Sequence, residues 1–386
     1  MTAVGILAAG CAQPTPQIIE KEVQVEKIVK ETVVVEKEVA VEKVVKETVV
    51  VQKEVAIEKV VTATPMPSKY REAPMLAELV KAGKLPPVDE RLPQEPMVLQ
   101  PLEEIGTYGG SWRLGMLGTA DTAMFTRTIG YEGLMRFAPE MENVIPNVAK
   151  AVDVSADGRT FTFSLRKGMK WSDGAPFTAD DILFWYEDIA LSKELTPNFP
   201  KPYTSAGKPC KVAKVDETTV SFSFDEPHGL FLMYLATSDQ AEATLRPKHY
   251  LEQFHPAHVA ADELDKKVKA AGFQNWWELF GDRNDLWSNE ERPRLHPWAL
   301  RVPLGTAPTV IADRNPYYWK VDTAGNQLPY LDTVLLRVHV DRQTILMDAV
   351  SGEIDMQQRH VGVYSDYPLL SQNAQAGNYR FFWLTP

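Results

Sequence analysis

Residues 152–181, VDVSADGRTFTFSLRKGMKWSDGAPFTADD, decide the fold of this chain. Apolar and polar residues alternate from Thr160 to Arg166, and a shorter run at Val152–Ser155 precedes Asp157-Gly158. Alternation is typical of a strand with one buried face. The Asp-Gly pair favours a tight turn, because glycine accepts the positive φ that such a turn requires. The first half of the stretch therefore predicts a β-hairpin.

The second half of the stretch predicts a capped helix. Thr178 is a natural N-cap, and Asp180 and Asp181 favour the positive end of the helix dipole. The expected helix covers roughly residues 179–191 and buries five apolar side chains: Ile182, Leu183, Trp185, Tyr186 and Ile189. We interpret this segment as architecture, a turn followed by a cap and a core helix, rather than as a site.

Alternation and turn residues predict two further strands, at Ser111–Leu117 and at Thr219–Phe224, and a helix-like segment at 122–131. A loop at 322–326 could suggest a calcium site, but its residues more simply predict a hairpin turn.

Composition limits the classes of function. The chain has 386 residues, of which 44% are hydrophobic and 10% aromatic, enough to bury the cores of two domains. The net charge of −11 and the lack of a basic cluster argue against nucleic acid as a partner. Two cysteines, Cys11 and Cys210, are too few for a disulfide framework. Nucleotide-binding and serine-hydrolase motifs are missing from the sequence, as is any apolar run long enough to span a membrane.

The first residues indicate an anchored protein. Val4–Cys11, VGILAAGC, resembles the lipobox of bacterial lipoproteins, in which the cysteine is acylated. We therefore predict that residues 1–11 are a lipoprotein signal remnant and that Cys11 carries lipid. A signal peptide carries basic residues before its apolar run, and this sequence has none there. We therefore expect the gene to start upstream of Met1.

A repetitive stalk is predicted over residues 12–68. The sequence EKEVQVEKIVKETVVV at 20–35 recurs with small changes at 36–51, and a partial copy follows at 52–61. Alternating valines favour an extended chain, whereas closely spaced Glu and Lys support a helix, so both conformations stay open. The segment is a spacer or a low-complexity linker. Residues 69–105 are expected to lie over the surface of the body, with a short helix at 73–82 that ends at Gly83.

Several motifs appear in a fixed order through the body. They are YEGL at 131–134, PNVA at 146–149, DGRTFTF at 157–163, LRKGMKWSDG at 165–174, FTADD at 177–181, RNPYYW at 314–319, LPYLD at 328–332 and GEID at 352–355. Each motif is weak evidence alone. The ordered set, covering about residues 106–386, resembles the family of bacterial extracellular solute-binding proteins, family 5, which includes oligopeptide, dipeptide and nickel binders.

This resemblance implies an α/β fold of the periplasmic-binding-protein type II kind, with mixed sheets and two lobes joined by hinge strands. The first lobe is expected at 106–335, with a hinge strand near 334–340. Residues 336–386 then hold the hinge and the start of the second lobe. Family members are longer, so we expect this sequence to be a fragment with an incomplete second lobe.

The resemblance also implies a role in transport rather than catalysis. We predict an extracytoplasmic, lipid-anchored, monomeric protein that binds a ligand without a cofactor and delivers it to the permease and ATPase subunits of an ABC importer. An oligopeptide is the leading ligand, because a cleft with backbone donors and acceptors can hold an extended peptide. An oligosaccharide is the alternative, and a cell-envelope hydrolase or a stalked scaffold are less favoured.

Four residues are predicted to bind the ligand: Tyr131, Glu132, Gly133 and Asp121. In relatives the loop that matches YEGL lies at the cleft wall, where its acidic residue can reach the ligand. Gly133 would allow close approach of the backbone. Two alternatives stay open, that Glu132 only braces its loop and that Asp121 only caps the following helix.

Two other groups of residues are weighed and set aside. His255 and His258 are three residues apart, but no carboxylate or cysteine cluster accompanies them in the sequence, so we predict no metal site. Trp276, Trp277 and Trp287 belong to a tryptophan-rich stretch that ends at Trp298. Indole rings can stack on sugars, yet we favour packing of these aromatics within their own subdomain.

Overall fold

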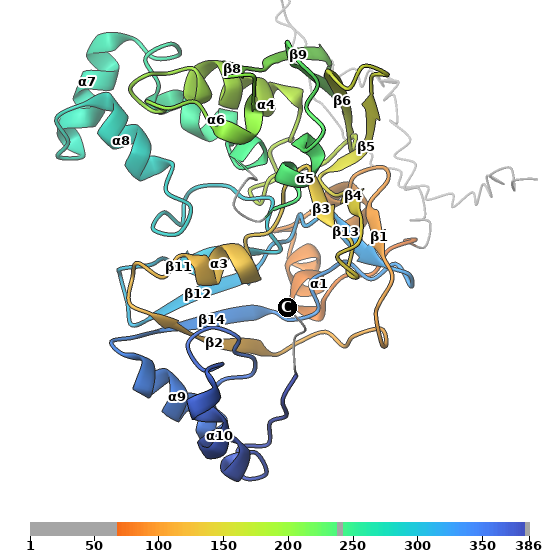
Figure 1. The fold of residues 1–386 in the computed structure, drawn as a ribbon, viewed down its shortest axis with the longest axis vertical. Coiled ribbons are helices and arrows are strands. Elements are labelled where there is room, and N and C mark those ends of the chain that lie inside the picture. The colour runs from red at the N-terminus through yellow and green to blue at the C-terminus, as the bar shows by residue number, and fades with distance from the viewer. Residues whose placement is uncertain (1–67, 238–241, 383–386) are drawn as a thin grey trace, which may run out of the picture. The chain divides into compact units, whose positions relative to one another are not determined.

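The computed structural model describes residues 68–237 and 242–382 and shows a mixed α/β protein with several sheets (Figure 1). Cys11 and the repeats at 20–61 lie outside the described residues. Two four-stranded sheets dominate the described part, each beside its own apolar core.

The central sheet has the strand order β11-β12-β14-β2. Its strands are β2 (Ser111–Leu117), β11 (Trp298–Val302), β12 (Thr309–Arg314) and β14 (Thr333–His339). β14 pairs antiparallel with β12 and parallel with the edge strand β2. β2 has the predicted bounds, and β14 lies where the hinge strand was expected. Helix α3 (Ala123–Thr128) packs Met124 and Phe125 into the core of this sheet.

The second sheet is antiparallel, in the order β5-β6-β10-β9, and contains the predicted hairpin. Its strands are β5 (Ala149–Val154), β6 (Thr160–Leu165), β9 (Lys211–Asp216) and β10 (Thr219–Ser223). Gly158 has a φ of +66°, as the turn requires. Every second residue of β6 is buried, and the core behind it is rich in aromatic rings, including Phe161, Phe163 and Phe222.

The predicted helix at 179–191 forms in two parts, α4 (Ala179–Phe184) and the π-helix η1 (Trp185–Ala190). Thr178 and Asp181 form a capping box, in which the Thr178 side chain accepts from backbone N–H groups and Asp181 accepts from the N–H of Thr178. Asp181 also accepts from the indole of Trp171, at 3.3 Å. The cap and the helix form as expected, and Ile182, Trp185 and Ile189 are buried, whereas Leu183 and Tyr186 are only partly buried.

Short strand pairs and helices complete the described chain. The strand pairs are β1 (Met97–Leu99) with β13 (Lys320–Asp322), β3 (Met135–Phe137) with β4 (Val144–Pro146), and β7 (Thr204–Ser205) with β8 (Lys208–Pro209). The other helices are α1 (Pro74–Lys81), α2 (Val88–Arg91), α5 (Phe231–Leu235), α6 (Lys248–Leu251), α7 (Ala261–Ala270), α8 (Trp276–Arg283), α9 (Arg342–Val350) and α10 (Tyr367–Asn373), with 3-10 turns η2 (Lys201–Tyr203), η4 (Glu242–Thr244), η5 (Glu252–Phe254) and η6 (Tyr364–Asp366). Within the described residues, no helix combines the length and the apolar character needed to cross a membrane.

The extension at 69–105 is integrated more deeply than a segment lying over the surface. β1 pairs in parallel with β13, and Arg91 is fully buried. The Arg91 guanidinium donates to Glu72, to the carbonyl of Pro316 and, at 2.9 Å, to Gln327. Its packing therefore helps to hold the loop that carries β13.

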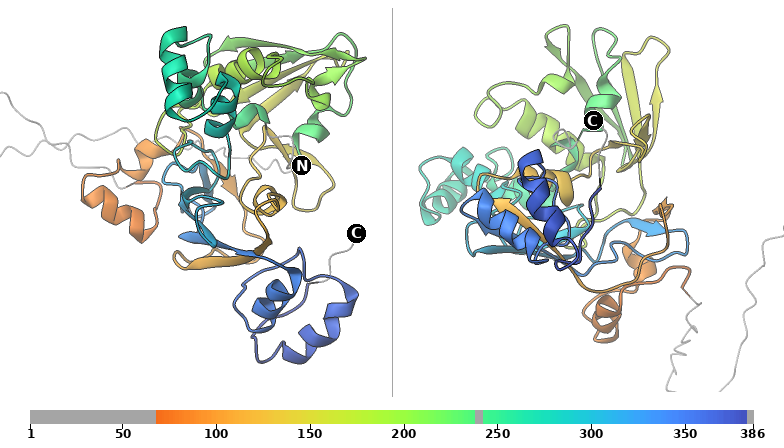
Figure 2. Two further views of the ribbon diagram at one scale, coloured as in Figure 1. Left: turned by 90° about the vertical axis from the view of Figure 1, so that its left-hand side faces the viewer. Right: turned by 60° about the horizontal axis from the view of Figure 1, so that its bottom comes forward.

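The segment after β14 leaves large apolar side chains uncovered. Helices α9 and α10 lie beyond the edge strand β2, away from the second sheet (Figures 1 and 2). Their small core contains Ile345, Leu346, Val361 and Leu370. Large apolar side chains such as Val340 and Tyr364 are more than 90% exposed.

Candidate functional site

The loop that follows α3 carries three of the predicted site residues and places Glu132 in a buried cluster. Glu132 is 3% exposed. One of its carboxylate oxygens accepts from the Tyr318 hydroxyl at 2.6 Å, the other accepts from the Asn147 amide at 2.9 Å, and both lie within 3.0 Å of the Lys320 ammonium. Each oxygen therefore has two partners within the chain.

Burial of this ion pair carries an energetic cost. Lys320 is fully buried, and burial lowers the pKa of its ammonium to about 8, because the attraction of Glu132 offsets only part of the cost of removing the charge from water. The surrounding hydrogen bonds saturate the carboxylate, which is the arrangement that makes a buried pair tolerable. Removal of either partner would leave an uncompensated charge.

The neighbours of Glu132 are fixed in the same way. The Tyr131 hydroxyl donates to the carbonyl of Ala236, and the Arg136 guanidinium lies 5.2 Å from the centre of the Tyr131 ring. Gly133 is buried, and its carbonyl accepts from the side-chain amide of Asn147 at 2.9 Å. The loop at 131–133 is therefore held in one conformation by contacts from several segments.

Asp121 lies at the other end of α3 and has different partners. It is 7% exposed. Its carboxylate accepts from the Leu117 N–H at 3.1 Å, from Nε of Arg359 at 2.9 Å, and contacts Nε2 of His360 at 2.7 Å. The alternative that Asp121 caps the helix is wrong, since α3 begins after Thr122 without a side-chain cap.

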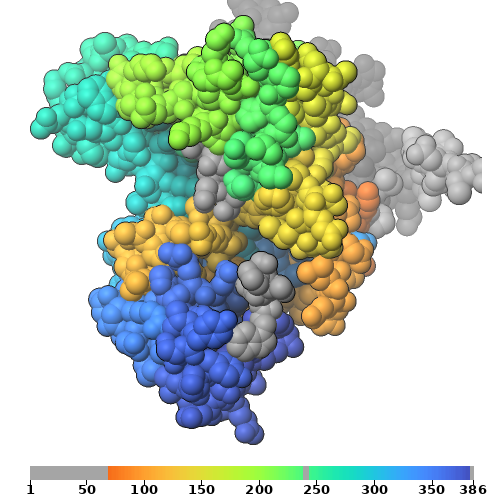
Figure 3. Space-filling view, in the orientation of Figure 1, coloured from red at the N-terminus to blue at the C-terminus, as the bar shows by residue number. Residues whose placement is uncertain are grey.

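The side-chain partners of Asp121, Arg359 and His360, belong to the segment after β14, and further contacts join the same two regions. Arg113 on β2 donates to Asp355 at 2.6 Å. The side-chain amide of Gln357 bonds the backbone N–H and carbonyl of Gly115, at 3.0 and 2.9 Å. Strand β2 and the loop after it therefore connect the central sheet to residues 353–360. In the space-filling view the blue segment that follows β14 lies against the golden stretch that contains α3 (Figure 3).

The structure thus brings together Tyr131, Glu132 and Gly133 and separates them from Asp121 by a helix. Their role in ligand binding stays a prediction. Lys320 and Tyr318 were missed as partners of Glu132. The available signal was that Glu132, Asn147 and Tyr318 stand in three of the ordered motifs, which converge on this cluster.

A shallow apolar depression of about 320 Å³ borders the cluster. Its walls are Pro297, Trp298, Tyr318, Leu328, Pro329, Tyr330 and Leu331. Tyr318 contributes to this wall and bonds Glu132 through its hydroxyl. The nearby tryptophans pack largely inward, since Trp287 and Trp298 are 6% and 9% exposed, whereas Trp277 is 39% exposed. The burial of Trp287 and Trp298 supports the interpretation that these rings pack within the protein.

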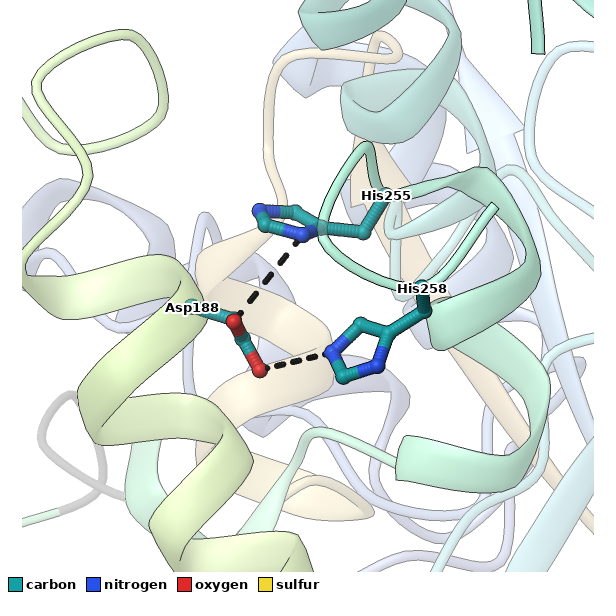
Figure 4. A group of neighbouring side chains, drawn as sticks. All are labelled: Asp188, His255 and His258. Carbon is teal, nitrogen blue, oxygen red and sulfur yellow. Dashed lines mark hydrogen bonds and ion pairs between the residues drawn. The ribbon is translucent and has the colours of Figure 1, made fainter. Parts of the chain in front are cut away.

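The loop at 322–326 is a turn, as expected. The Asp322 carboxylate accepts from the backbone N–H groups of Ala324 and Asn326, at 2.8 and 2.9 Å. The expectation that no carboxylate accompanies His255 and His258 is wrong, because a residue distant in the sequence lies beside them in the fold. Asp188 on η1 contacts both imidazoles (Figure 4).

Comparison with known proteins gives a consistent result. Residues 143–383 match the family model described as bacterial extracellular solute-binding proteins, family 5, middle. The chain is 35% identical over 318 residues to the periplasmic α-galactoside-binding protein of Rhizobium meliloti, an alignment that covers 75% of this chain and 42% of that protein. It is also 34% identical over 176 residues to the dipeptide-binding protein of Escherichia coli, covering 38% of this chain and 32% of that protein.

Two solved structures are similar to it. The oligopeptide-binding protein OppA matches 81% of this chain and 49% of its own, with a TM-score of 0.76 and 42% identity. The periplasmic binding protein MelB of Agrobacterium fabrum, in complex with stachyose, matches 80% of this chain and 46% of its own, with a TM-score of 0.63 and 28% identity. The chain spans half or less of the length of these relatives.

Proposed function

The chain belongs to family 5 of the bacterial extracellular solute-binding proteins, and we propose that it captures a small ligand outside the cytoplasm for an ATP-driven importer. The family is extracytoplasmic, and its members bind substrates for transport. In this proposal the permease and ATPase subunits of an ABC importer receive the ligand, and the protein itself catalyses no reaction.

A peptide is the ligand that we favour. One observation carries this choice, the match of 81% of the chain to the oligopeptide-binding protein OppA at 42% identity and a TM-score of 0.76. A binding cleft that offers backbone donors and acceptors to an extended peptide needs few side-chain contacts. The predicted ligand-binding residues would then contribute to one wall of such a cleft, with Tyr131, Glu132 and Gly133 at one end of α3 and Asp121 at the other.

An α-galactoside oligosaccharide is the second candidate. It is supported by the 35% identity over 318 residues to the α-galactoside-binding protein and by the similarity to the stachyose-bound MelB. Aromatic faces would then stack on sugar rings. The two candidates differ in ligand chemistry and agree in the transport role.

Thermal melts and calorimetry with a mixed-sequence pentapeptide and with stachyose separate these candidates. A ligand that binds only the folded state raises the melting temperature. A shift with the peptide supports the favoured ligand, whereas a shift with stachyose alone selects the second. Chromatography of each ligand after incubation tests for turnover, which would indicate an enzyme. The chain spans half or less of the length of its relatives, so these measurements use the full-length gene product. No shift of that product with either ligand would count against a binding function.

We also propose that Cys11 carries the lipid that anchors the protein. Cys11→Ser should move the protein from the membrane fraction to the soluble fraction of the cells that make it. Cys210→Ser is the matched control, because Cys210 is buried in the body and should leave the distribution unchanged. Retention of the Cys11 variant on membranes would overturn the proposal.

A further inference from the structure

Three potential metal ligands meet on the side of the second sheet that carries η1. Asp188 projects from the π-helix η1 towards His255 and His258, which follow the turn η5 (Figure 4). One carboxylate oxygen of Asp188 lies 2.9 Å from Nε2 of His258, and the other lies 3.9 Å from Nδ1 of His255. With one ligand atom taken from each residue, the three atoms lie within 4.8 Å of one another.

This spacing suits a small divalent ion. Zinc binds imidazole nitrogen and carboxylate oxygen at about 2.0–2.2 Å in tetrahedral geometry, which separates its ligands by roughly 3.3 Å. The two nitrogen–oxygen separations, 2.9 and 3.9 Å, lie on either side of that value, and the three groups are within 4.8 Å of one another, so shifts of about 1 Å would centre an ion between them. Sites with three protein ligands leave the fourth position to water, and the side chain of His258 is 29% exposed on the open side.

The position of His255 also suits a ligand. Its side chain is 9% exposed, and its Nδ1 faces the Asp188 carboxylate. The Ala257 N–H lies 3.3 Å from the same nitrogen, a long hydrogen bond that a metal ion would replace. Metal binding requires a neutral imidazole with a free lone pair.

The backbone of the site is unusual. Asp188 lies in a π-helix, a form that is rare and is found mainly at functional positions, because its wider turn redirects side chains. The imidazoles sit against aromatic rings, with Phe184 5.8 Å from His258 and Trp276 5.0 Å from His255, measured between ring centres. These rings restrict the orientation of both potential ligands.

We propose that Asp188, His255 and His258 bind one divalent transition-metal ion of the zinc class. The ion would join η1 to the start of the α7–α8 pair. That pair has a small core of its own, formed by Leu264, Val268 and Leu279. A metal ion at this position would therefore stabilise the attachment of the pair to the rest of the molecule. This inference is independent of the proposed transport function.

Titration of the tag-free chain, first treated with chelator, tests the site by calorimetry with ZnCl₂ alone. We expect one ion per chain. Asp188→Asn and His258→Gln should each weaken binding by about a hundredfold or more, since loss of an outer-shell partner alone costs 10–100-fold. Co²⁺ should give the intense visible absorption of a tetrahedral site with nitrogen and oxygen ligands, and Zn²⁺ should reduce hydrogen exchange in residues 255–284.

His249→Gln is the matched control. His249 forms a pair with Asp173 at 2.7 Å, and its side chain is 35% exposed, compared with 29% for His258. The Asp173 pair contains one histidine instead of two. This variant should bind zinc as the parent does. Melting curves in chelator show whether each variant is folded, and the Co²⁺ spectrum of the parent tests the site without any substitution. The proposal would be overturned if the parent bound no zinc, or if the Asp188 and His258 variants bound it as tightly as the parent does. The three residues would then form only an imidazole–carboxylate ion pair.

Discussion

Glu132 and Asp121 are both buried carboxylates near the two ends of helix α3, yet they connect different parts of the molecule. The partners of Glu132 are Asn147, Tyr318 and Lys320, all of which precede β14. The side-chain partners of Asp121 are Arg359 and His360, which follow it. One cluster therefore joins segments that all precede β14, and the other joins the loop after β2 to the segment that follows β14.

The two clusters also differ in how much water reaches them. Lys320 has no exposed surface, whereas the side chain of Arg359 is 36% exposed. Water screens the charges of the second cluster but not those of the first. Loss of an ion pair should therefore lower the free energy of unfolding more in the first cluster than in the second. We therefore expect Glu132 to contribute strongly to the stability of the fold, and Asp121 to stabilise mainly the contact with the segment after β14.

The largest effect is expected for Glu132→Ala. It would leave the Lys320 ammonium buried without its counter-ion and lower the free energy of unfolding by about 3–5 kcal/mol. Chemical denaturation of the parent and the variant measures this loss. Glu353→Gln is the control, because Glu353 is 61% exposed and 3.3 Å from Arg113, where little change is expected. Equal losses in the two variants would remove the distinction drawn here.

Glu132→Gln tests the ligand role predicted from the sequence. The variant leaves the Lys320 ammonium without its counter-ion, so we expect a lower melting temperature. Binding that is also weaker by about 1–3 kcal/mol, the range for losing a charged hydrogen-bond partner, would support the ligand role. Calorimetry and a melt of the ligand-free variant measure the two quantities. Unchanged affinity with a lower melting temperature would make Glu132 a structural residue.

An intermediate, pH-dependent effect is expected at His296, which supports α3 between the two carboxylates. His296 is fully buried and stacks on Trp287 at 5.8 Å, and Trp287 stacks on Phe125 of α3 at 4.5 Å. Burial, together with the charges of Arg294 and Arg292, lowers the pKa of His296 from 6.5 to about 3.

The sign of this effect follows from proton binding. Between these pKa values the unfolded chain binds a proton that the folded protein does not. The stabilising contribution is therefore complete above pH 6.5 and is lost as the pH falls towards 3. The free energy of unfolding should fall by up to about 1.4 kcal/mol per pH unit from this group. His296→Phe should lack that component, and identical pH profiles for the two proteins would refute the assignment.

The sequence predicted local structure well, for a physical reason. The hairpin at Asp157-Gly158, the cap at Thr178 and the strand Ser111–Leu117 depend on turn chemistry, helix-end hydrogen bonds and alternation within a few residues. Each of these signals depends on residues that are close to one another in the sequence. The family resemblance then supplied the two-lobed fold, which the local signals alone do not specify.

The partners of the site residues could not be predicted in this way. Lys320 is 188 positions from Glu132, and His360 is 239 positions from Asp121. Nothing in the chain near Glu132 marks which of many lysines it meets, because packing of distant segments decides the pairing. The same holds for Asp188, whose carboxylate pairs with His258 from a helix 70 positions earlier in the chain. The sequence around His255 and His258 therefore does not indicate this partner.

The smallest effect on global stability is expected for Asp121→Asn. The amide oxygen can still accept from the Leu117 N–H, but the charge that attracts Arg359 and His360 is lost. These partners are partly exposed, so the free energy of unfolding should change by about 1 kcal/mol or less. Local opening should respond more clearly, because an ion pair that joins two segments stabilises mainly their contact.

Limited proteolysis measures that opening. A change of about 1 kcal/mol corresponds to about a fivefold rise in the open population, so cleavage within residues 340–382 should accelerate by a similar factor. Asp313→Asn is the control, because Asp313 pairs with Arg301 inside the central sheet and has no contact with residues 353–360 among those described. Equal cleavage rates in the two variants would mean that the Arg113–Asp355 and Gln357–Gly115 contacts hold the segment without help. The connecting role would then belong to strand β2 rather than to Asp121.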